Sequence, residues 1–168
     1  MAAFQESMIE YRKQLEKGAI QRAYQGLMDY IMGLRSYFAE KYPDYSVSGS
    51  IYFGYMDMSY FSFFPKSLKL QGLKVGIVFV HCQFRFEVWL FGYNKGIQAK
   101  YWKQFKESGW NKYRIPSTIK GVDSILESIL VENPDFSNLV ALTTQIERET
   151  MKFIEDVEDF LSKHCKRG

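Results

Sequence analysis

Residues 73–92 read LKVGIVFVHCQFRFEVWLFG, and this stretch decides the fold. It contains two runs rich in β-branched and aromatic residues, 73–81 and 84–92, which is the composition of β-strands. Cys82 and Gln83 separate the two runs and suit a two-residue turn, the commonest hairpin connection. The sequence therefore predicts an antiparallel hairpin at the centre of a sheet.

The predicted hairpin has two unlike faces, because side chains alternate along a strand. In this register Val78 faces Glu87 and Gly76 faces Trp89, so we expect the glycine to leave room for the Trp89 ring. One face carries only apolar side chains: Val75, Ile77, Phe79, Phe86, Val88 and Leu90. The other face is mixed: Lys74, Gly76, Val78, Val80, Arg85, Glu87, Trp89 and Phe91.

Further strands and helices are predicted on both sides of the hairpin. Residues 45–64 are expected to be extended with a bend near 54–57, either as one bulged strand or as a second hairpin. Downstream, Asn94 can cap a helix that ends near residue 107, and the β-branched segment 124–131 favours a strand. Apolar residues spaced three and four apart predict three more helices, over 4–15, 19–41 and 137–162.

These elements predict an α+β fold in a single domain, residues 1–168. We expect an antiparallel meander of about four to five strands covered by long amphipathic helices. The order of helix, meander, helix and strand also fits a restriction-endonuclease-like core. The apolar stripe of the last helix is interpreted as core, with a seam for a second copy as the alternative.

Composition limits the classes of protein. The chain has 168 residues, is 46% hydrophobic and 24% charged, and carries a net charge of +3, as a folded globular protein does. It shows no apolar run long enough to span a bilayer and no secretory signal at its start. Two cysteines are too few for a disulfide framework, so we expect a cytoplasmic protein.

Charge is distributed unevenly along the chain. Basic residues dominate 95–120 and acidic residues dominate 123–159. We interpret these segments as solvated faces that attract each other within the fold, with an anion site on 95–120 as the alternative. Trp102, Trp110 and Tyr113 lie among the basic residues, but such a mixture usually marks a packed aromatic face, so nucleic acid is not the expected partner.

The mixed face of the hairpin holds the candidate site. Arg85, Glu87 and Trp89 are two residues apart in turn and share one face, where they can position a ligand. Tyr55 and Asp57 are added as candidates, because Asp57 is an acid within apolar sequence. An acid there either caps a bend, which is the favoured interpretation, or lies in a binding pocket.

The sequence does not predict a catalytic or a metal site. Nucleases of the restriction-endonuclease class place a Lys two residues after a metal-binding acid, whereas Trp89 stands at that position after Glu87. The pairs His81–Cys82 and His164–Cys165 could in principle complete a zinc site, but adjacent residues are poor chelates. We therefore expect no metal, no cofactor and no catalytic residue.

Three blocks carry a resemblance to a known family: residues 52–60 (YFGYMDMSY), 84–90 (FRFEVWL) and 121–135 (GVDSILESILVENPD). The chain resembles a family of uncharacterised bacterial proteins, common in gut Bacteroidetes and Firmicutes, that is described as a domain of unknown function. The resemblance extends from about Gly18 to Leu161. It implies a bacterial, cytosolic protein and supplies no catalytic residues.

The expected function is therefore a non-catalytic domain that binds a small ligand, a peptide or another protein through Tyr55, Asp57, Arg85, Glu87 and Trp89. One alternative is a degenerate nuclease-like enzyme with Asp57 and Glu87 as metal ligands. The other is a homodimeric structural protein that associates through its last helix.

Overall fold

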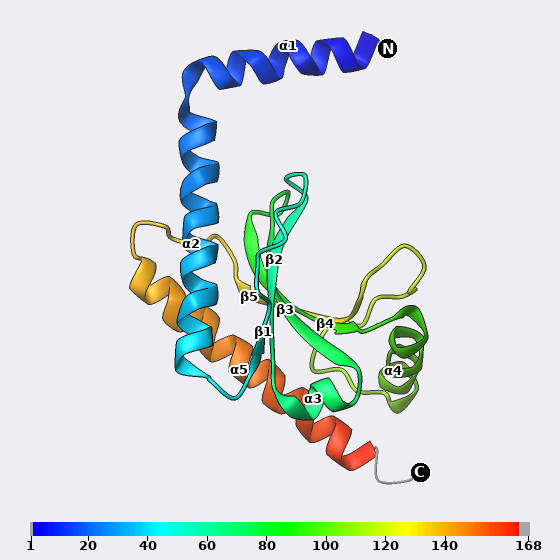
Figure 1. Cartoon of the computed structure of the whole chain (residues 1–168). Helices are drawn as coiled ribbons and strands as arrows, with labels where there is room; N and C mark the ends of the chain where they lie inside the picture. Colours follow the sequence, from blue (N-terminus) through cyan, green and yellow to red (C-terminus); the bar gives the residue numbers. More distant parts are fainter. Residues whose placement is uncertain (1, 165–168) are drawn as a thin grey trace.

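The computed structural model describes residues 2–164 and shows five helices and five strands over that range (Figure 1). In chain order they are α1 (Ala2–Lys17), α2 (Ala19–Lys41), β1 (Ser46–Val47), β2 (Met58–Phe64), α3 (Lys66–Leu70), β3 (Leu73–Val80), β4 (Arg85–Gly92), α4 (Lys95–Ser108), β5 (Ser124–Val131) and α5 (Leu139–His164). None of these helices is long and apolar enough to cross a bilayer.

The five strands form one antiparallel sheet in the order of the sequence, which confirms the predicted α+β fold. A consecutive antiparallel order of this kind does not show a restriction-endonuclease-like arrangement. The segment 124–131 is a strand, as its β-branched residues predicted. The connection between β2 and β3 contains the short helix α3.

The central hairpin has the predicted register. Val80 pairs with Arg85, and Gly76 pairs with Trp89. The amide of Phe84 donates to the carbonyl of His81 at 3.1 Å, so Cys82 and Gln83 occupy the middle of the turn. Phe84 closes this turn with a φ of 52°, a left-handed conformation that is uncommon for an aromatic residue.

The aromatic segment before this hairpin is itself a hairpin, which settles the alternative left open by the sequence. Tyr52 pairs with Tyr60, and β1 pairs with the far end of β2. Residues 54–57 form the tip. Gly54 and Met56 adopt positive φ angles of 72° and 60° there, which reverses the chain within four residues.

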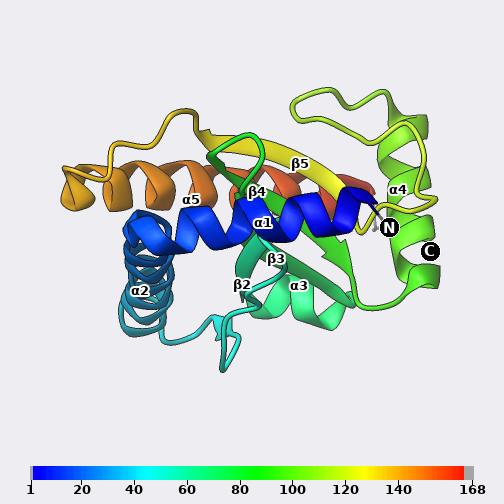
Figure 2. The ribbon, with the colours of Figure 1, turned by 90° about the horizontal axis from the view of Figure 1, so that it is seen from above.

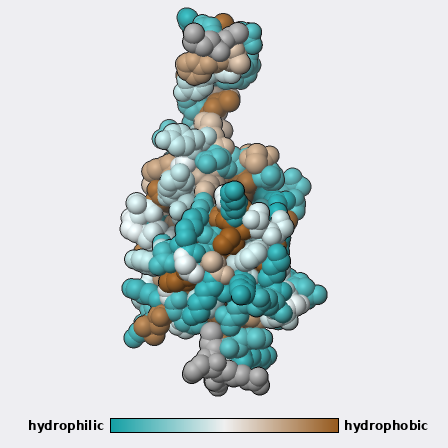
Figure 3. Space-filling view, turned by 90° about the vertical axis from the view of Figure 1, so that its right-hand side faces the viewer, coloured by the Kyte–Doolittle hydropathy of each residue, from teal (hydrophilic) through white to brown (hydrophobic). Residues whose placement is uncertain are grey.

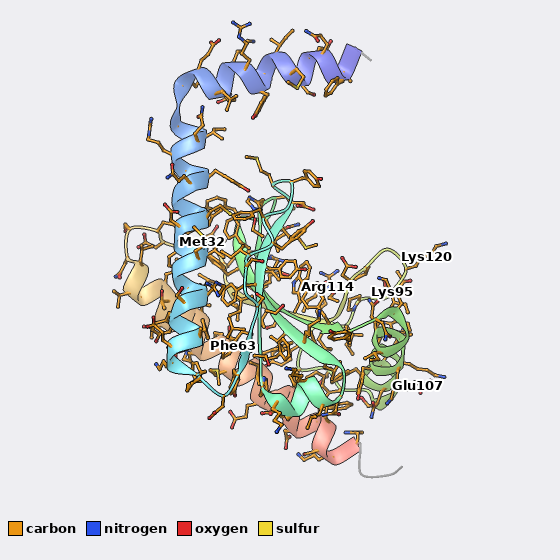
Figure 4. The ribbon with its side chains drawn as sticks, viewed as in Figure 1. Met32, Phe63, Lys95, Glu107, Arg114 and Lys120 are labelled. Carbon is orange, nitrogen blue, oxygen red and sulfur yellow. The ribbon has the colours of Figure 1, made fainter. Side chains whose placement is uncertain are left out.

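The sheet has an inner face and an outer face. The inner face carries the predicted apolar side chains of β3 and β4 together with Phe61 and Phe63 of β2, all buried. Phe38 of α2 lies 4.6 Å from Phe63 between ring centroids, and Phe153 of α5 is completely buried in the same core. Figure 4 shows Phe63 on the side of the sheet that faces α2.

On α2, the residues buried in this core lie between Met28 and Phe38. Ile31, Leu34 and Phe38 are buried as the predicted stripe requires, whereas Tyr24 and Leu27 are only partly buried. Its first turns therefore extend beyond the sheet and carry α1 away from the body of the molecule (Figure 1). The stripe of α5, in contrast, is buried over most of its length, so the interpretation as core is confirmed.

The outer face consists of the side chains that alternate with the inner ones on β2, β3 and β4: Met58, Tyr60, Ser62, Lys74, Gly76, Val78, Val80, Arg85, Glu87, Trp89 and Phe91. In Figure 1, α4 and the loop that follows it lie on the opposite side of the sheet from α2. A Cβ atom on Gly76 would meet the Phe91 ring at 2.6 Å. The ring placed over this glycine is therefore that of Phe91, and the expectation that Trp89 covers it was wrong.

Candidate functional site

Arg85, Glu87 and Trp89 form one hydrogen-bonded network on the outer face, as their spacing on β4 predicted. The Glu87 Oε1 atom accepts from Arg85 Nε at 2.7 Å, and Glu87 Oε2 accepts from Trp89 Nε1 at 2.5 Å. Arg85 also pairs with Glu132 at 3.1 Å. Glu87 is only 4% exposed, so its charge is stabilised by Arg85 and Trp89 rather than by water.

The network orients side chains and is unsuited to acid–base chemistry. Burial disfavours the charge of Arg85, but its hydrogen bonds to Glu87 and Glu132 outweigh this effect and raise the pKa of Arg85. Both oxygens of Glu87 are occupied by donors that remain protonated at neutral pH. Glu87 thus fixes the guanidinium of Arg85 and the indole of Trp89 in place.

Tyr55 and Asp57 lie apart from this network, in the tip formed by residues 54–57. The Asp57 carboxylate accepts from the backbone amide of Tyr55 at 2.8 Å, and the amides of Tyr55 and Met58 lower the pKa of Asp57. Asp57 therefore caps the bend, as the favoured interpretation held. Tyr55 is 94% exposed at the same tip.

Two hollows lie on the outer face. The first, of about 340 Å³, is bounded by Tyr60 and Phe91 of the sheet and by residues at the start of α4. The second, of about 320 Å³, is lined by Arg85 and Glu87 and by the loop after α4. Viewed from the side of α4, apolar atoms near the centre are ringed by hydrophilic ones (Figure 3).

An aromatic pair forms the floor of the first hollow. Tyr60 and Phe91 stack with centroids 5.8 Å apart and planes inclined by 30°, and Trp89 lies 5.9 Å from Phe91. Lys74 and Lys95 stand on its rim. Lys95 pairs with Asp123 at 3.5 Å, with both side chains largely exposed, so this contact is weak and leaves Lys95 available to a ligand.

Sequence reasoning missed most residues of the two hollows. The mixed face of the hairpin predicted Trp89 and Phe91 as neighbours, but nothing in the local pattern joined them to Tyr60 or to the start of α4. The second hollow includes Arg114, whose backbone pairs with that of Glu127 in β5. Figure 4 shows Arg114 between the loop and the sheet. The only advance signal was the excess of basic residues in 95–120.

That basic segment is partly neutralised within the fold. Lys112 pairs with Asp156 at 3.0 Å, and Arg114 pairs with Glu127 at 3.1 Å, so the expected attraction between the basic and acidic segments is confirmed. The aromatic residues among them are packed inward. Trp102 donates to the carbonyl of Pro116, and Trp110 lies 5.4 Å from Phe160 of α5.

Ser59 and His81 are a hydrogen-bonded pair that resembles a catalytic dyad, but the hydrogen bond between them runs in the opposite direction. The Ser59 hydroxyl donates its one proton to the carbonyl of Phe53 at 2.5 Å. It must therefore accept from His81 Nε2 at 2.9 Å, and burial lowers the pKa of His81. With its proton committed and its side chain buried, Ser59 holds the hairpin tip against the sheet.

Metal-dependent chemistry gains no support from the geometry. Between residues 2 and 164, no group of three or more His, Cys, Asp and Glu side chains could hold a metal ion. Asp57 and Glu87, the ligands of the nuclease alternative, are held by different partners. Of the two His–Cys pairs, Cys165 lies outside the described residues.

The fold and its hollows define a class of protein: an α+β domain built on a five-stranded antiparallel meander, with two hollows on one face of the sheet. More particularly, the chain belongs to the DUF7000 family, a domain of unknown function whose match covers residues 4–161. The expectation that the chain belongs to a family described as a domain of unknown function is thereby confirmed. No curated protein and no solved structure matches the chain.

Proposed function

We propose that this protein is a non-catalytic binding domain that holds a small ligand in the first hollow of the outer face. The observation that carries the proposal is the stacked pair of Tyr60 and Phe91 beneath a rim with two lysines. An aromatic floor favours a flat ring, and Lys74 and Lys95 favour a negative charge on it. The ligand class is therefore a small aromatic anion.

The size and lining of this hollow support binding rather than catalysis. A volume of about 340 Å³ is at the lower end of the range of small-molecule sites. Among the described residues that line it there is no His or Cys, and the one carboxylate, that of Asp123, faces Lys95. Trp89, which Glu87 orients, lies against Phe91 of the floor.

The proposal is tested by following indole and backbone NMR signals while aromatic carboxylates such as benzoate and indole-3-acetate are added. Cyclohexanecarboxylate supplies the charge without the flat ring, and benzyl alcohol supplies the ring without the charge. We expect saturable shifts at Trp89 Nε1 and at Lys95 with the aromatic carboxylates only. No saturable shift at Trp89, or shifts centred on another surface, would contradict the proposal.

Two tyrosine variants localise the site. Tyr60→Ser removes half of the aromatic floor and is expected to weaken binding at least about tenfold, since stacking contributes on the order of 1.5 kcal/mol. Tyr55→Ser is the matched control at the hairpin tip and is expected to leave binding unchanged. If Tyr55→Ser weakened binding and Tyr60→Ser did not, the ligand would bind at the hairpin tip, as the sequence suggested.

We also propose that the domain works in the cytoplasm of a bacterium. Cys82 is a free and exposed thiol in the turn of the central hairpin, which suits a reducing compartment. The bacterial origin follows from the resemblance described above.

A further inference from the structure

The helix α1 carries an apolar stripe that no residue between 2 and 164 covers. Phe4, Met8, Tyr11 and Leu15 are spaced four, three and four residues apart and so share one side of the helix. Phe4, Met8 and Tyr11 are exposed by 72%, 43% and 53%, and Leu15 is half-buried. Figure 3 shows α1 standing clear of the body of the molecule.

A helix in this position needs a partner. An isolated helix of 16 residues is only marginally stable in water, because helices in proteins depend on packing of an apolar side. The family match begins at residue 4, so α1 is part of the domain itself rather than an appendage to it.

The same chain contains an apolar groove that is also uncovered. It has a volume of about 630 Å³ and lies between the first turns of α2, the two hairpin tips and the start of α5. Apolar side chains from all of these elements line it, including Ala23, Tyr24, Leu27, Met56, Phe84 and Phe136. Met56 and Phe84 are each more than half exposed at its edge.

The stripe cannot reach the groove of its own chain. Gly18 alone joins α1 to α2, in a left-handed conformation with a φ of 73°. Two helices need a loop of roughly two to five residues to fold back against each other. Because the first turns of α2 form one wall of the groove, α1 would have to fold back along α2 to enter it. Seen from above, α1 instead crosses over the tips of the sheet (Figure 2).

We propose that α1 docks into this groove on a second copy of the chain, and that the second copy returns the same contact. In this reciprocal exchange the α1 stripe of each copy covers the groove of the other copy. The two contacts are related by a twofold axis, so the assembly is a closed dimer. The dimer contains two such contacts, and each contact buries the four apolar side chains of one α1 together with the groove surface that they cover. The total is roughly 1,600 Å² of buried surface, the size of a stable interface. This dimer is independent of the ligand site, which lies on the outer face of the sheet.

Light scattering and sedimentation on the full chain measure the first consequence. We expect twice the mass of one chain at micromolar concentrations, and a monomer up to near-millimolar concentrations would overturn the proposal. Met8→Glu places a charge on the stripe and is expected to weaken the dimer by at least about tenfold. Ile9→Glu is the matched control, because Ile9 is 47% exposed on the same helix but points away from the stripe.

The groove is tested by Ala23→Glu, with Ser36→Glu as the control on an exposed site of α2 outside the groove. All four positions are exposed or at the edge of the groove, so circular dichroism should show unchanged folding. Ala23→Glu is expected to be monomeric and Ser36→Glu dimeric. Dissociation by the two control variants, or none by Met8→Glu and Ala23→Glu, would place the interface elsewhere and overturn the exchange.

Mixing the two monomeric variants distinguishes exchange from simple pairing of α1 helices. A mixed dimer of Met8→Glu and Ala23→Glu gathers both substitutions in one contact and leaves the other contact with its native stripe and groove. We therefore expect mixing to restore a dimer weaker than the native one. An interface of α1 against α1 would leave Ala23→Glu dimeric by itself, and would contradict the proposal.

Discussion

The inner and outer faces of the sheet are built on the same three strands from alternating residues, yet they are held together by different forces. On the inner face, rings from β2 and α2 such as Phe63 and Phe38 pack without polar contacts. On the outer face, a carboxylate fixes Arg85 and Trp89 through directional hydrogen bonds. The two hollows beside this network are lined by charged as well as aromatic side chains, whereas the groove that reaches Phe79 of the inner face is lined mainly by apolar ones.

The largest expected effect on stability is seen when an aromatic ring is removed from the inner face and is compared with the removal of one from the outer face. Phe63→Ala leaves a cavity in a close-packed core, because Phe63 is completely buried among Phe38, Tyr42 and Tyr45. We expect it to lower the free energy of unfolding by about 4 kcal/mol, within the range measured for buried phenylalanines. Urea denaturation followed by circular dichroism measures the change.

Phe91→Ala is the matched change on the outer face, where the ring is only partly buried. Part of its surface already contacts water, so we expect a loss of about 1 kcal/mol. Equal losses for the two variants would mean that the outer face is packed as tightly as the core, and the contrast between the faces would then be wrong.

The second-largest expected effect on stability comes from the hydrogen-bonded network of Arg85, Glu87 and Trp89. Glu87→Ala leaves the half-buried guanidinium of Arg85 with only the exposed Glu132 as its partner. Removing one partner of a buried ion pair typically costs 3–5 kcal/mol, and the remaining pair reduces this, so we expect a loss of about 3 kcal/mol.

Glu132→Ala is the control for this variant, because the Glu132 side chain is 58% exposed and pairs with the same arginine. We expect a loss below about 0.5 kcal/mol from it. If thermal denaturation gave equal losses for both variants, Arg85 rather than Glu87 would be the centre of the network.

The inner face was predictable from the sequence and most of the binding space was not. Alternation on β3 and β4 assigns each side chain of the hairpin to one of the two faces, and it gives one of them only apolar residues, since a strand has a period of two. The register followed from the position of the turn. The ring over Gly76 was assigned to Trp89 instead of Phe91, because pairing fixes which residues face each other but not the side-chain rotamers.

The hollows escaped prediction because they depend on contacts between distant segments. Lys95 reaches the first hollow only because α4 starts beside β4, and Arg114 reaches the second only through its backbone pairing with β5. Asp57 was proposed as a site residue on its apolar surroundings, but its carboxylate is used by the backbone of its own turn. Local sequence shows that an acid needs a partner without showing which partner it has.

The third effect is pH-dependent and belongs to the helices of the inner face. Glu147 of α5 accepts hydrogen bonds from Tyr37 at 2.6 Å and from Tyr42 at 2.5 Å, and pairs with Lys41 of α2 at 2.7 Å. Burial opposes its charge, but these donors outweigh it and hold the pKa of Glu147 below its ordinary value. Burial and the Glu147 carboxylate in turn raise the pKa of Tyr42 to about 12.

A carboxyl whose pKa is lower in the folded than in the unfolded state stabilises the fold above its unfolded pKa of about 4.5. This contribution disappears as the pH falls through the folded pKa. We expect Glu147→Gln to cost about 2 kcal/mol at neutral pH, as hydrogen bonds to charged groups do, and progressively less in acid. Denaturation curves from pH 7 to pH 3 measure this, with the exposed Glu155→Gln as the control. A difference from the native chain that stays constant with pH would exclude Glu147 as the titrating group.

The smallest expected effect isolates one hydrogen bond of the outer face. Trp89→Phe keeps an aromatic wall beside Phe91 but removes the donor to Glu87 Oε2. The buried oxygen loses one partner while Arg85 still holds the other, so we expect a loss of about 1 kcal/mol. The measurement is thermal denaturation of Trp89→Phe, Glu87→Gln and the double variant. If the network is a single unit, the loss in the double variant is smaller than the sum of the two single losses. Strict additivity would mean that the hydrogen bond between Trp89 and Glu87 does not contribute to stability, and Trp89 would then not belong to the network.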